Sequence, residues 1–396
     1  MQAKRVYNMN RRQSLAVLSG AAIGIPRASG RGRAAAQRAS HPKGPISPDK
    51  LLLRDYRPRS IYKIPKTRIA RAKFPVIDCH THPYARTAAD VDQWVKNMDA
   101  VGLEKGVILT MATGEKFKEV GKRFLPHKDR FELWCGFDFT QFGSAGFERQ
   151  ALDALEKCHD MGATGVGELV DKGRGLGART GRGPAGRGTR PTGPRPHPGD
   201  PRMDALFERC GRLGMPVSIH VSDPPWAYQP MDQTNDGLMN GYKWRIEVKP
   251  GVMGHQALIQ SLEHAVKKHP KTIFFACHLT NQSDDLTPLG EMFDRNPNLY
   301  ADIGARYAET ACIPRFVAQF FSKYSDRILY GTDMGYEQEM YRTTFRILET
   351  ADEHFYHFQF GYHWYLNGFN LPDAVLKKIY RDNALAAFSR ARQNMA

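Results

Sequence analysis

A short stretch near residue 80 places two histidines and an aspartate at alternate positions. Asp78, His80 and His82 follow directly on the apolar run 74–77. Because side chains on a strand alternate between its faces, these three would point to one side at the strand's carboxyl end. Imidazole and carboxylate groups are ligands that Zn²⁺ and similar divalent ions prefer. A buried strand whose histidines bond into a core would give the same pattern, so the metal hypothesis needs further ligands.

Three later segments end in the same types of residue. His220, His278 and Asp333 each close a short strand-like run. A lone histidine in such a place is more often a hydrogen-bonded core residue, but four strand ends with one chemistry favour a shared site. The pattern therefore predicts a divalent metal site. A metal ion there would lower the pKa of a water to about 7 and make it a nucleophile.

The candidate ligands must be positioned by a scaffold of parallel strands. Strand-like runs rich in Val, Ile, Phe and Tyr occur at 76–82, 106–111, 131–139, 164–170, 216–221, 273–278, 299–303 and 328–333. Helical patterns lie between most of them, at 89–101, 145–161, 203–213, 257–269 and 313–324. Eight alternating units predict the α/β class and a (β/α)₈ TIM barrel with its site at the carboxyl ends of the strands. An open doubly wound sheet is the weaker alternative, because its ligands would gather at one switch point.

Several motifs together carry a family resemblance: Asp78-x-His80-x-His82, His220, His278, Gly331-Thr332-Asp333 and the segment 379–388. The chain resembles the amidohydrolase superfamily, in the amidohydrolase-related branch that also contains the aminocarboxymuconate semialdehyde decarboxylases. The resemblance covers about residues 74–396. It implies that the divalent ion, with Zn²⁺ preferred, is held by His80, His82, His220 and Asp333. It also places His278 beside the substrate as an acid, base or electrophile.

Two acidic residues have further expected roles. Asp333 would take the proton of the attacking water as well as contact the metal, since a general base must lie within hydrogen-bond reach of its proton. Asp78 would orient one of the histidines rather than bind the ion.

Glu168, at the end of the fourth strand, occupies a place where many two-metal members of the superfamily carry a bridging carboxylated lysine or glutamate. We expect one ion, with Glu168 supporting the site or contacting substrate. A second ion bridged by Glu168 is the alternative.

Long segments after the fifth and seventh strands would lie at the same face as the ligands. Trp226, Arg245 and Arg306 in these segments are candidate substrate contacts. An arginine at a barrel mouth favours a carboxylate-bearing substrate through paired hydrogen bonds. The alternative is that the aromatic residues form a packed lid.

The strongly basic composition belongs to two appendages. The chain has 396 residues and a formal charge of +16. Residues 1–73 contain 18 Lys and Arg against 2 acidic residues, and residues 171–202 contain 8 against 2, so the remainder is net acidic. Neither appendage interleaves aromatic residues with its charges as base-stacking proteins do. Nucleic-acid binding is therefore not expected, and the predicted partner is a small molecule.

The appendages themselves have separate interpretations. Residues 1–36, with Arg11-Arg12 before a weakly apolar stretch, resemble a twin-arginine export signal, so we expect an exported or periplasmic protein. The alternative is a cytoplasmic protein with a disordered leader. The stretch is too short for a transmembrane helix. Residues 37–73 are predicted to be a basic linker. The Gly, Arg and Pro mixture of 171–202 is predicted to be a disordered insertion, with or without a role in attracting anionic substrates.

The six cysteines show no Cys-x-x-Cys spacing. Cys79 and Cys277 are adjacent to candidate ligands, and strand alternation predicts that both point away from the site toward the surrounding helices.

Three functions are consistent with these observations. The first is a metal-dependent hydrolase that cleaves an ester, lactone or amide bond with a metal-activated water. The second is a metal-dependent decarboxylase of the same branch. The third is a non-catalytic barrel that binds a partner through its basic segments. The oligomeric state is not predicted.

Overall fold

The computed structural model describes residues 46–177, 195–238, 245–246, 250–358 and 363–395. The predicted export signal, 1–36, and the first part of the predicted linker, 37–45, lie outside these residues. The chain divides into two units, residues 1–51 and residues 52–396. The described part of the first unit contains one short 3₁₀ turn, Pro48–Lys50.

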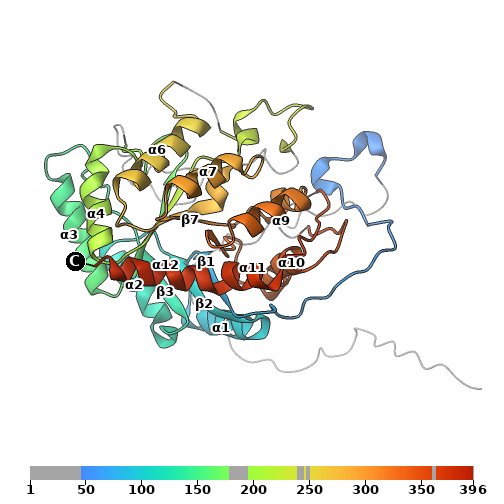
Figure 1. Cartoon of the computed structure of the whole chain (residues 1–396), viewed down its shortest axis with the longest axis horizontal. Helices are drawn as coiled ribbons and strands as arrows, with labels where there is room; N and C mark the ends of the chain where they lie inside the picture. The colour runs from blue at the N-terminus through green and yellow to red at the C-terminus, as the bar shows by residue number, and fades with distance from the viewer. Residues whose placement is uncertain (1–45, 178–194, 239–244, 247–249, 359–362, 396) are drawn as a thin grey trace, which may run out of the picture. The chain divides into compact units, whose positions relative to one another are not determined.

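The second unit contains a barrel of parallel strands (Figure 1). Within the described residues, eight strands form one sheet in the order of the sequence, and every neighbouring pair is parallel. This confirms the predicted (β/α)₈ TIM barrel. The strands are β1 (Val76–Thr81), β2 (Leu103–Leu109), β3 (Phe131–Cys135), β4 (Gly165–Asp171), β5 (Val217–Val221), β6 (Phe274–Ala276), β7 (Leu299–Asp302) and β8 (Ile328–Leu329).

Backbone hydrogen bonds join the two ends of this sheet. The amide of Cys79 donates to the carbonyl of Tyr330 at 2.9 Å, and the amide of Asp333 donates to the carbonyl of His80 at 2.8 Å. The segment after β8 therefore lies against β1, and the barrel is nearly closed. This contact brings the last predicted ligand beside the first two.

Helices follow most of the strands and cover the outside of the barrel. In α1, Thr87 and Asp90 form a capping box at the start, and Gly102 ends the helix in a left-handed conformation with φ of +91°. The α-helices that the structure describes in this unit are α1 (Ala88–Val101), α2 (Gly114–Phe124), α3 (Phe147–Asp160), α4 (Asp204–Arg212), α6 (His255–Lys268), α7 (Thr287–Arg295), α8 (Tyr307–Thr310), α9 (Pro314–Lys323), α10 (Gln338–Glu349), α11 (Asp373–Lys377) and α12 (Asn383–Gln393). None of the helices that the structure describes is long and apolar enough to cross a membrane.

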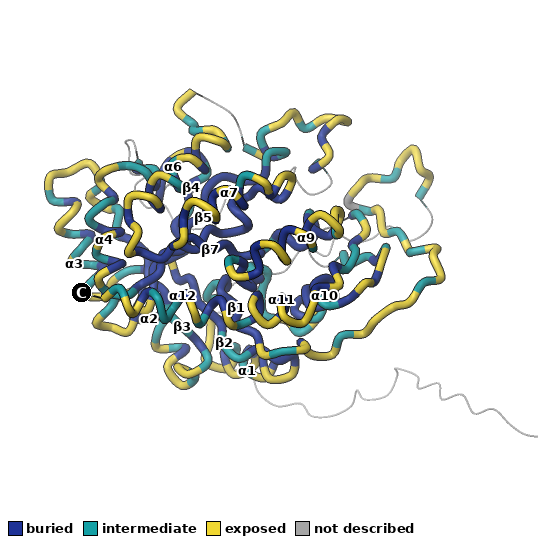
Figure 2. Tube along the Cα trace, viewed as in Figure 1, coloured by how far each residue is buried: buried dark blue, intermediate teal, exposed yellow. Residues whose placement is uncertain are grey.

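The interior of the barrel is filled by large side chains. Trp134 of β3 and Phe275 of β6 have ring centroids 5.3 Å apart although their strands are not neighbours, so they meet across the barrel. Figure 2 shows that most of the strand residues are buried. Helix α12 covers the ends where the strands begin, because the Asn383 amide donates to the carbonyl of Ile328 at the start of β8. The candidate site lies at the opposite end of the barrel, where the strands have their carboxyl ends.

Phe275 offers a test of this interior. Its side chain is 1% exposed. Replacing it with alanine should lower the free energy of unfolding by about 3–5 kcal/mol, because the buried ring leaves a cavity. Denaturant unfolding would measure the loss, with Phe316→Ala, at a 41% exposed position, as the control that changes little. Equal stability of the two variants would contradict the central position of Phe275.

The insertion after β4 is anchored at both ends, which corrects the prediction that all of 171–202 is disordered. The Asp171 carboxylate accepts hydrogen bonds from the amides of Gly173 and Gly175 and lies 2.6 Å from Nδ1 of His197. Leu176 is fully buried, and its amide donates to a carbonyl of the returning segment at 2.7 Å. The sequence argument counted apolar residues and missed this carboxylate anchor. Residues 178–194 lie outside the described residues.

Residues 52–73, in the predicted linker, are bound to the barrel unit. The amide and hydroxyl of Thr67 both donate to the carboxylate of Asp352, each at 2.7 Å. The amide of Lys73 donates to the Glu349 carboxylate at the end of α10. This part of the chain is therefore a surface strap.

Candidate active site

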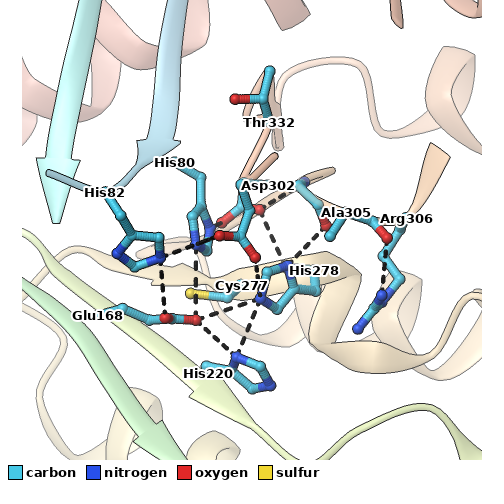
Figure 3. A network of polar contacts seen from close by, with 12 residues as sticks. His80, His82, Glu168, His220, Cys277, His278, Asp302, Ala305, Arg306 and Thr332 are labelled. Atoms are coloured by element: carbon cyan, nitrogen blue, oxygen red, sulfur yellow. Dashed lines mark hydrogen bonds and ion pairs between the residues drawn. The ribbon is translucent and has the colours of Figure 1, made fainter. Parts of the chain in front are cut away.

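The predicted ligands come together at the carboxyl ends of the strands (Figure 3). They extend from five different strand ends, at β1, β4, β5, β6 and β8. The set consists of His80, His82, Glu168, His220, His278 and Asp333. Five of them were predicted from their position at the end of an apolar run and Glu168 from the family resemblance, and the barrel places all of them in one cluster.

His80, His82 and Asp333 form the first group of metal donors. Nε2 of His82 lies 3.2 Å from Oδ1 of Asp333, and Nε2 of His80 lies 3.9 Å from the same oxygen. The other ring nitrogen of His82, Nδ1, donates to the carbonyl of Leu109 at 3.0 Å. This hydrogen bond fixes the proton on Nδ1 and leaves Nε2 of His82 with a lone pair for a metal.

His80 shows most directly that the group fits a metal. Its side chain is fully buried, and within the described part of the chain its Nε2 has no hydrogen-bond partner. A buried polar atom without a partner costs free energy, so native proteins rarely contain one unless a ligand satisfies it. Nδ1 of His80 is 2.9 Å from Oδ2 of Asp302. Nε2 is therefore free to bind a metal ion.

Glu168 lies between two pairs of histidines. One of its oxygens is 2.7 Å from Nδ1 of His220 and 3.4 Å from Nε2 of His278. The other oxygen is 3.4 Å from Nε2 of His82. Glu168, His220 and His278 form a second group of donors. Because this carboxylate reaches both groups, its position is compatible with a bridge between two ions as well as with support of one.

His278 is held in an uncommon backbone conformation. β6 ends at Ala276, and residues 278–281 take left-handed values, with φ of +60° at His278. Such values cost non-glycine residues energy and concentrate at functional sites. Nδ1 of His278 lies 2.7 Å from the carbonyl of Gly304, which can only accept, so Nδ1 carries the proton. Nε2 then presents a lone pair to the site.

Without a bound ion, the carboxylates of the cluster are ionised and His80 holds a proton that a metal ion would displace. Burial, with the positive charges of His220 and His80 nearby, lowers the pKa of His278 to about 4, so it is neutral at pH 7. Burial also acts to lower the pKa of His80, but the surrounding carboxylates, Asp302 first, outweigh it and raise the pKa to about 9. Glu168 and Asp333 have lowered pKa values because the positive histidines around them outweigh the effect of burial. The carboxylates are thus ionised and ready to hold a cation.

Asp302, at the end of β7, is a site residue that sequence reasoning missed. Its Oδ2 holds Nδ1 of His80, and its Oδ1 accepts from the amides of His278 and Gly304 at 3.2 and 2.8 Å. It thereby orients the ring of His80, the role that was predicted for Asp78. The available signal was that Asp302 is an acidic residue inside the apolar strand run 299–303.

Asp78 has a different role from the predicted one. Its carboxylate accepts from the amide of His80 at 3.1 Å and from the amide and hydroxyl of Thr332 at 3.0 and 2.6 Å. The pairing of β1 with β2 shifts register between Asp78 and Thr81, so simple alternation fails there. Asp78 therefore joins β1 to the segment after β8 and contacts no histidine ring.

Replacing Asp302 with asparagine should weaken metal binding by about 10–100-fold, the usual cost of losing a partner that orients a ligand. The amide nitrogen would donate to Nδ1 of His80 and favour the tautomer that carries its proton on Nε2, which cannot bind a metal. Competition with a chromophoric chelator would measure the Zn²⁺ affinity. The exposed Asp326→Asn variant serves as control. Unchanged affinity in the Asp302 variant would show that the tautomer of His80 does not depend on this contact.

The predicted substrate contacts are less well placed than the ligands. Arg306 is 8% exposed, and its guanidinium donates to the side-chain oxygen of Asn281 at 2.9 Å and to the carbonyl of Ala305 at 2.9 Å. Trp226, in a 3₁₀ turn, packs its ring against Gly237. Arg245 is exposed. Their contact with substrate stays a prediction.

Two other contacts around the cluster were not predicted. The hydroxyl of Tyr84 donates to Oδ1 of Asp333 at 3.2 Å. Lys172 is paired with Asp223 at 2.8 Å, and Asp223 lies 3.7 Å from Nε2 of His220. Both are polar side chains just beyond the ends of strands, β1 for Tyr84 and β4 and β5 for the pair.

The fold and the donor groups together define a (β/α)₈ barrel with a candidate metal site at the carboxyl ends of its strands. A model of the Amidohydrolase family matches residues 77–390. The chain belongs to this family, whose members are generally metal-dependent enzymes. No curated protein matches the chain.

Several solved structures are similar to the chain at low sequence identity. An uncharacterized TIM-barrel protein, Bb4693 from Bordetella bronchiseptica, is 15% identical with a TM-score of 0.50, over 81% of this chain and 100% of that one. The 4-oxalomesaconate hydratase LigJ from Rhodopseudomonas palustris is 14% identical with a TM-score of 0.48, over 80% and 97%. An amidohydrolase from Burkholderia multivorans with bound zinc is 10% identical with a TM-score of 0.40, over 79% and 99%. The first of these supports the barrel fold.

Proposed function

We propose that this protein is a divalent-metal-dependent hydrolase that cleaves an ester, lactone or amide bond of a small molecule. The observation that carries the proposal is the group His80, His82 and Asp333, in which the fully buried Nε2 of His80 has no hydrogen-bond partner among the described residues. Membership of the amidohydrolase family supports an enzyme over a non-catalytic barrel.

The donor set also suits the metal that we propose. Neutral imidazole and carboxylate groups are preferred by Zn²⁺ and other borderline divalent ions. A divalent ion held here would supply a water whose pKa is lowered from about 16 to about 7. One ion on the first donor group is sufficient for this chemistry, and Glu168 offers a shared ligand if a second ion binds to His220 and His278.

Asp333 is the residue best placed to move a proton. Its side chain is 25% exposed, against 19% for His82 and none for His80, so Asp333 is the most exposed donor of this group. Its lowered pKa keeps it ionised and able to accept a proton from the attacking water. Tyr84 donates to Oδ1 and so fixes the orientation of the carboxylate.

His278 lies on the other side of Asp333. Its Nε2 is 3.8 Å from Oδ2 of Asp333. Being neutral with its proton on Nδ1, it presents a lone pair that can receive a proton from Asp333 or the substrate, or bind a second ion. It would act as an acid only after taking up a proton.

A metal-dependent decarboxylase is the second candidate. It requires a cationic group that holds the substrate carboxylate, and Arg306 was the predicted residue. Three donor contacts of this guanidinium go to Asn281 and Ala305, which makes it a less available anion site. Hydrolysis is therefore the reaction we propose first.

An assay of two substrate panels separates these reactions. The metal-loaded protein is incubated with simple esters, lactones and amides in one panel and with aromatic and unsaturated carboxylates in the other, with carbon dioxide release recorded. We expect cleavage in the first panel that disappears after chelation and returns with Zn²⁺. Metal-dependent carbon dioxide release alone would replace hydrolysis by decarboxylation, and no turnover in either panel would favour a binding protein.

A further inference from the structure

Cys277 is directed into the candidate metal site. Its Sγ, a ring nitrogen of His80 and a carboxylate oxygen of Glu168 all lie within 4.8 Å of one another. Figure 3 shows the sulfur turned toward these two residues. The prediction that Cys277 points toward the surrounding helices is therefore wrong.

The backbone explains this orientation. Ile273 and Phe275 of the same segment belong to the cluster that fills the barrel, so alternation turns Cys277 inward as well. Alternation would then direct His278 outward, but its left-handed conformation turns its ring back into the site. Two consecutive side chains thus reach one site, which the sequence pattern does not predict. Cys79 also belongs to the interior cluster, so the prediction was wrong for it too, but none of the candidate donor groups of the described residues includes it.

The unpartnered nitrogen of His80 is a second, independent observation at the same place. His80 and Cys277 are both fully buried, and Nε2 of His80 has no hydrogen-bond partner within the described residues. The sulfur of Cys277 forms a hydrogen bond with Oγ of Ser218, at 3.0 Å. A metal ion bound to Nε2 of His80 would satisfy this buried nitrogen. Glu168 and the sulfur of Cys277 lie close to His80 and could contact the same ion.

We propose that Cys277 is a metal ligand that binds through its thiolate at the deep side of the site. The proposal rests on the metal-dependent function proposed above. As the metal–sulfur bond forms, the thiol proton is released to solvent, and the Ser218 hydroxyl donates to the sulfur and stabilises its charge. A Zn–S bond is about 2.3 Å long, so the donors must close around the ion from their present separations. A thiolate would favour Zn²⁺ over Mg²⁺, Ca²⁺ and Mn²⁺.

Cobalt substitution tests the proposal through absorption spectra. The chain carrying Cys312→Ser, which removes its exposed thiol, is loaded with one equivalent of Co²⁺. We expect visible d–d bands from bound Co²⁺ and a near-ultraviolet charge-transfer band from thiolate to cobalt. The charge-transfer band should be lost in Cys277→Ser and retained in the matched variant Cys79→Ser. The Zn²⁺ dissociation constant should rise at least about tenfold in Cys277→Ser only.

The outcomes separate this inference from the proposed function. Visible bands without a charge-transfer band would overturn the role of Cys277 and leave the metal site intact. Failure of the chain to bind Co²⁺ or Zn²⁺ at all would overturn the metal-dependent function itself. A charge-transfer band that persists in Cys277→Ser would assign the sulfur to another cysteine.

A second measurement does not depend on the folding of any cysteine variant at position 277. X-ray absorption of the Zn²⁺-loaded Cys312→Ser chain should show one sulfur neighbour at about 2.3 Å. A shell of nitrogen and oxygen alone would reduce Cys277 to a buried thiol that packs beside Ser218.

Discussion

Replacing His82 with alanine should remove bound metal and turnover together. The ring of His82 offers Nε2 between Asp333 and Glu168, and it is the most exposed of the four histidines of the cluster. Its loss removes a direct ligand, so the metal affinity should fall by more than the about 10–100-fold that supporting residues cost. Metal analysis after gel filtration and the rate of hydrolysis in the same sample would measure the effect.

The control for this variant is His127→Ala. His127 lies at the surface in a pair with Asp92, away from the site, and its loss should change neither quantity. Circular dichroism would show that both variants keep the fold. A His82→Ala protein that retains a full complement of metal, or full activity, would contradict the assignment of this histidine.

Replacing Asp333 with asparagine should lower kcat by about 10²–10⁴-fold at saturating metal, the range that a general base contributes. Asparagine keeps the shape and one oxygen but cannot take up a proton. The hydrogen bond from Tyr84 can remain, since an amide oxygen accepts as a carboxylate does. Steady-state kinetics with added Zn²⁺ would separate weaker metal binding from slower chemistry.

Asp153→Asn, at an exposed position on α3, is the matched control for this change. We expect its kinetics to equal those of the parent. If Asp333→Asn reached the parental kcat once metal was saturating, Asp333 would be a ligand only, and another group would have to accept the proton.

The scaffold and most of the donors could be predicted from the sequence because both depend on local signals. Each barrel strand is a short buried run, and the chain changes from apolar residues to a metal-binding type where such a run ends. His220 and His278 were found in this way, although they lie 58 positions apart and meet only in the folded barrel. Because parallel strands bring their carboxyl ends together, the position of a residue at the end of a strand was enough to predict that it lies in the site.

The missed residues are those at which local rules fail. The register shift in β1 turns Asp78 away from the histidine rings, and the left-handed backbone after β6 places Cys277 and His278 in the same site. Asp302 was missed because it is a member of a strand run and not the residue after it. These side-chain orientations depend on contacts between strands that are distant in the sequence, so they cannot be predicted from one strand alone.

The anchored insertion shows the same limitation. The composition of 171–202 predicts disorder, but a single buried carboxylate, Asp171, holds its first residues and the returning His197. Amino-acid composition describes the average of a whole segment. The order of these residues depends instead on the hydrogen bonds of one buried carboxylate, which composition does not reveal.

Titration of metal-free protein with Zn²⁺ tests the central claim most directly. Bound metal and the rate of ester or lactone cleavage would be measured in the same samples, after chelator has been removed. The site described above predicts no hydrolysis without metal, a rate that rises in proportion to bound Zn²⁺, and saturation at one ion per chain, or at two if Glu168 bridges a second. Full hydrolytic activity in protein shown to contain no metal, or tightly bound Zn²⁺ with no effect on the rate, would contradict it.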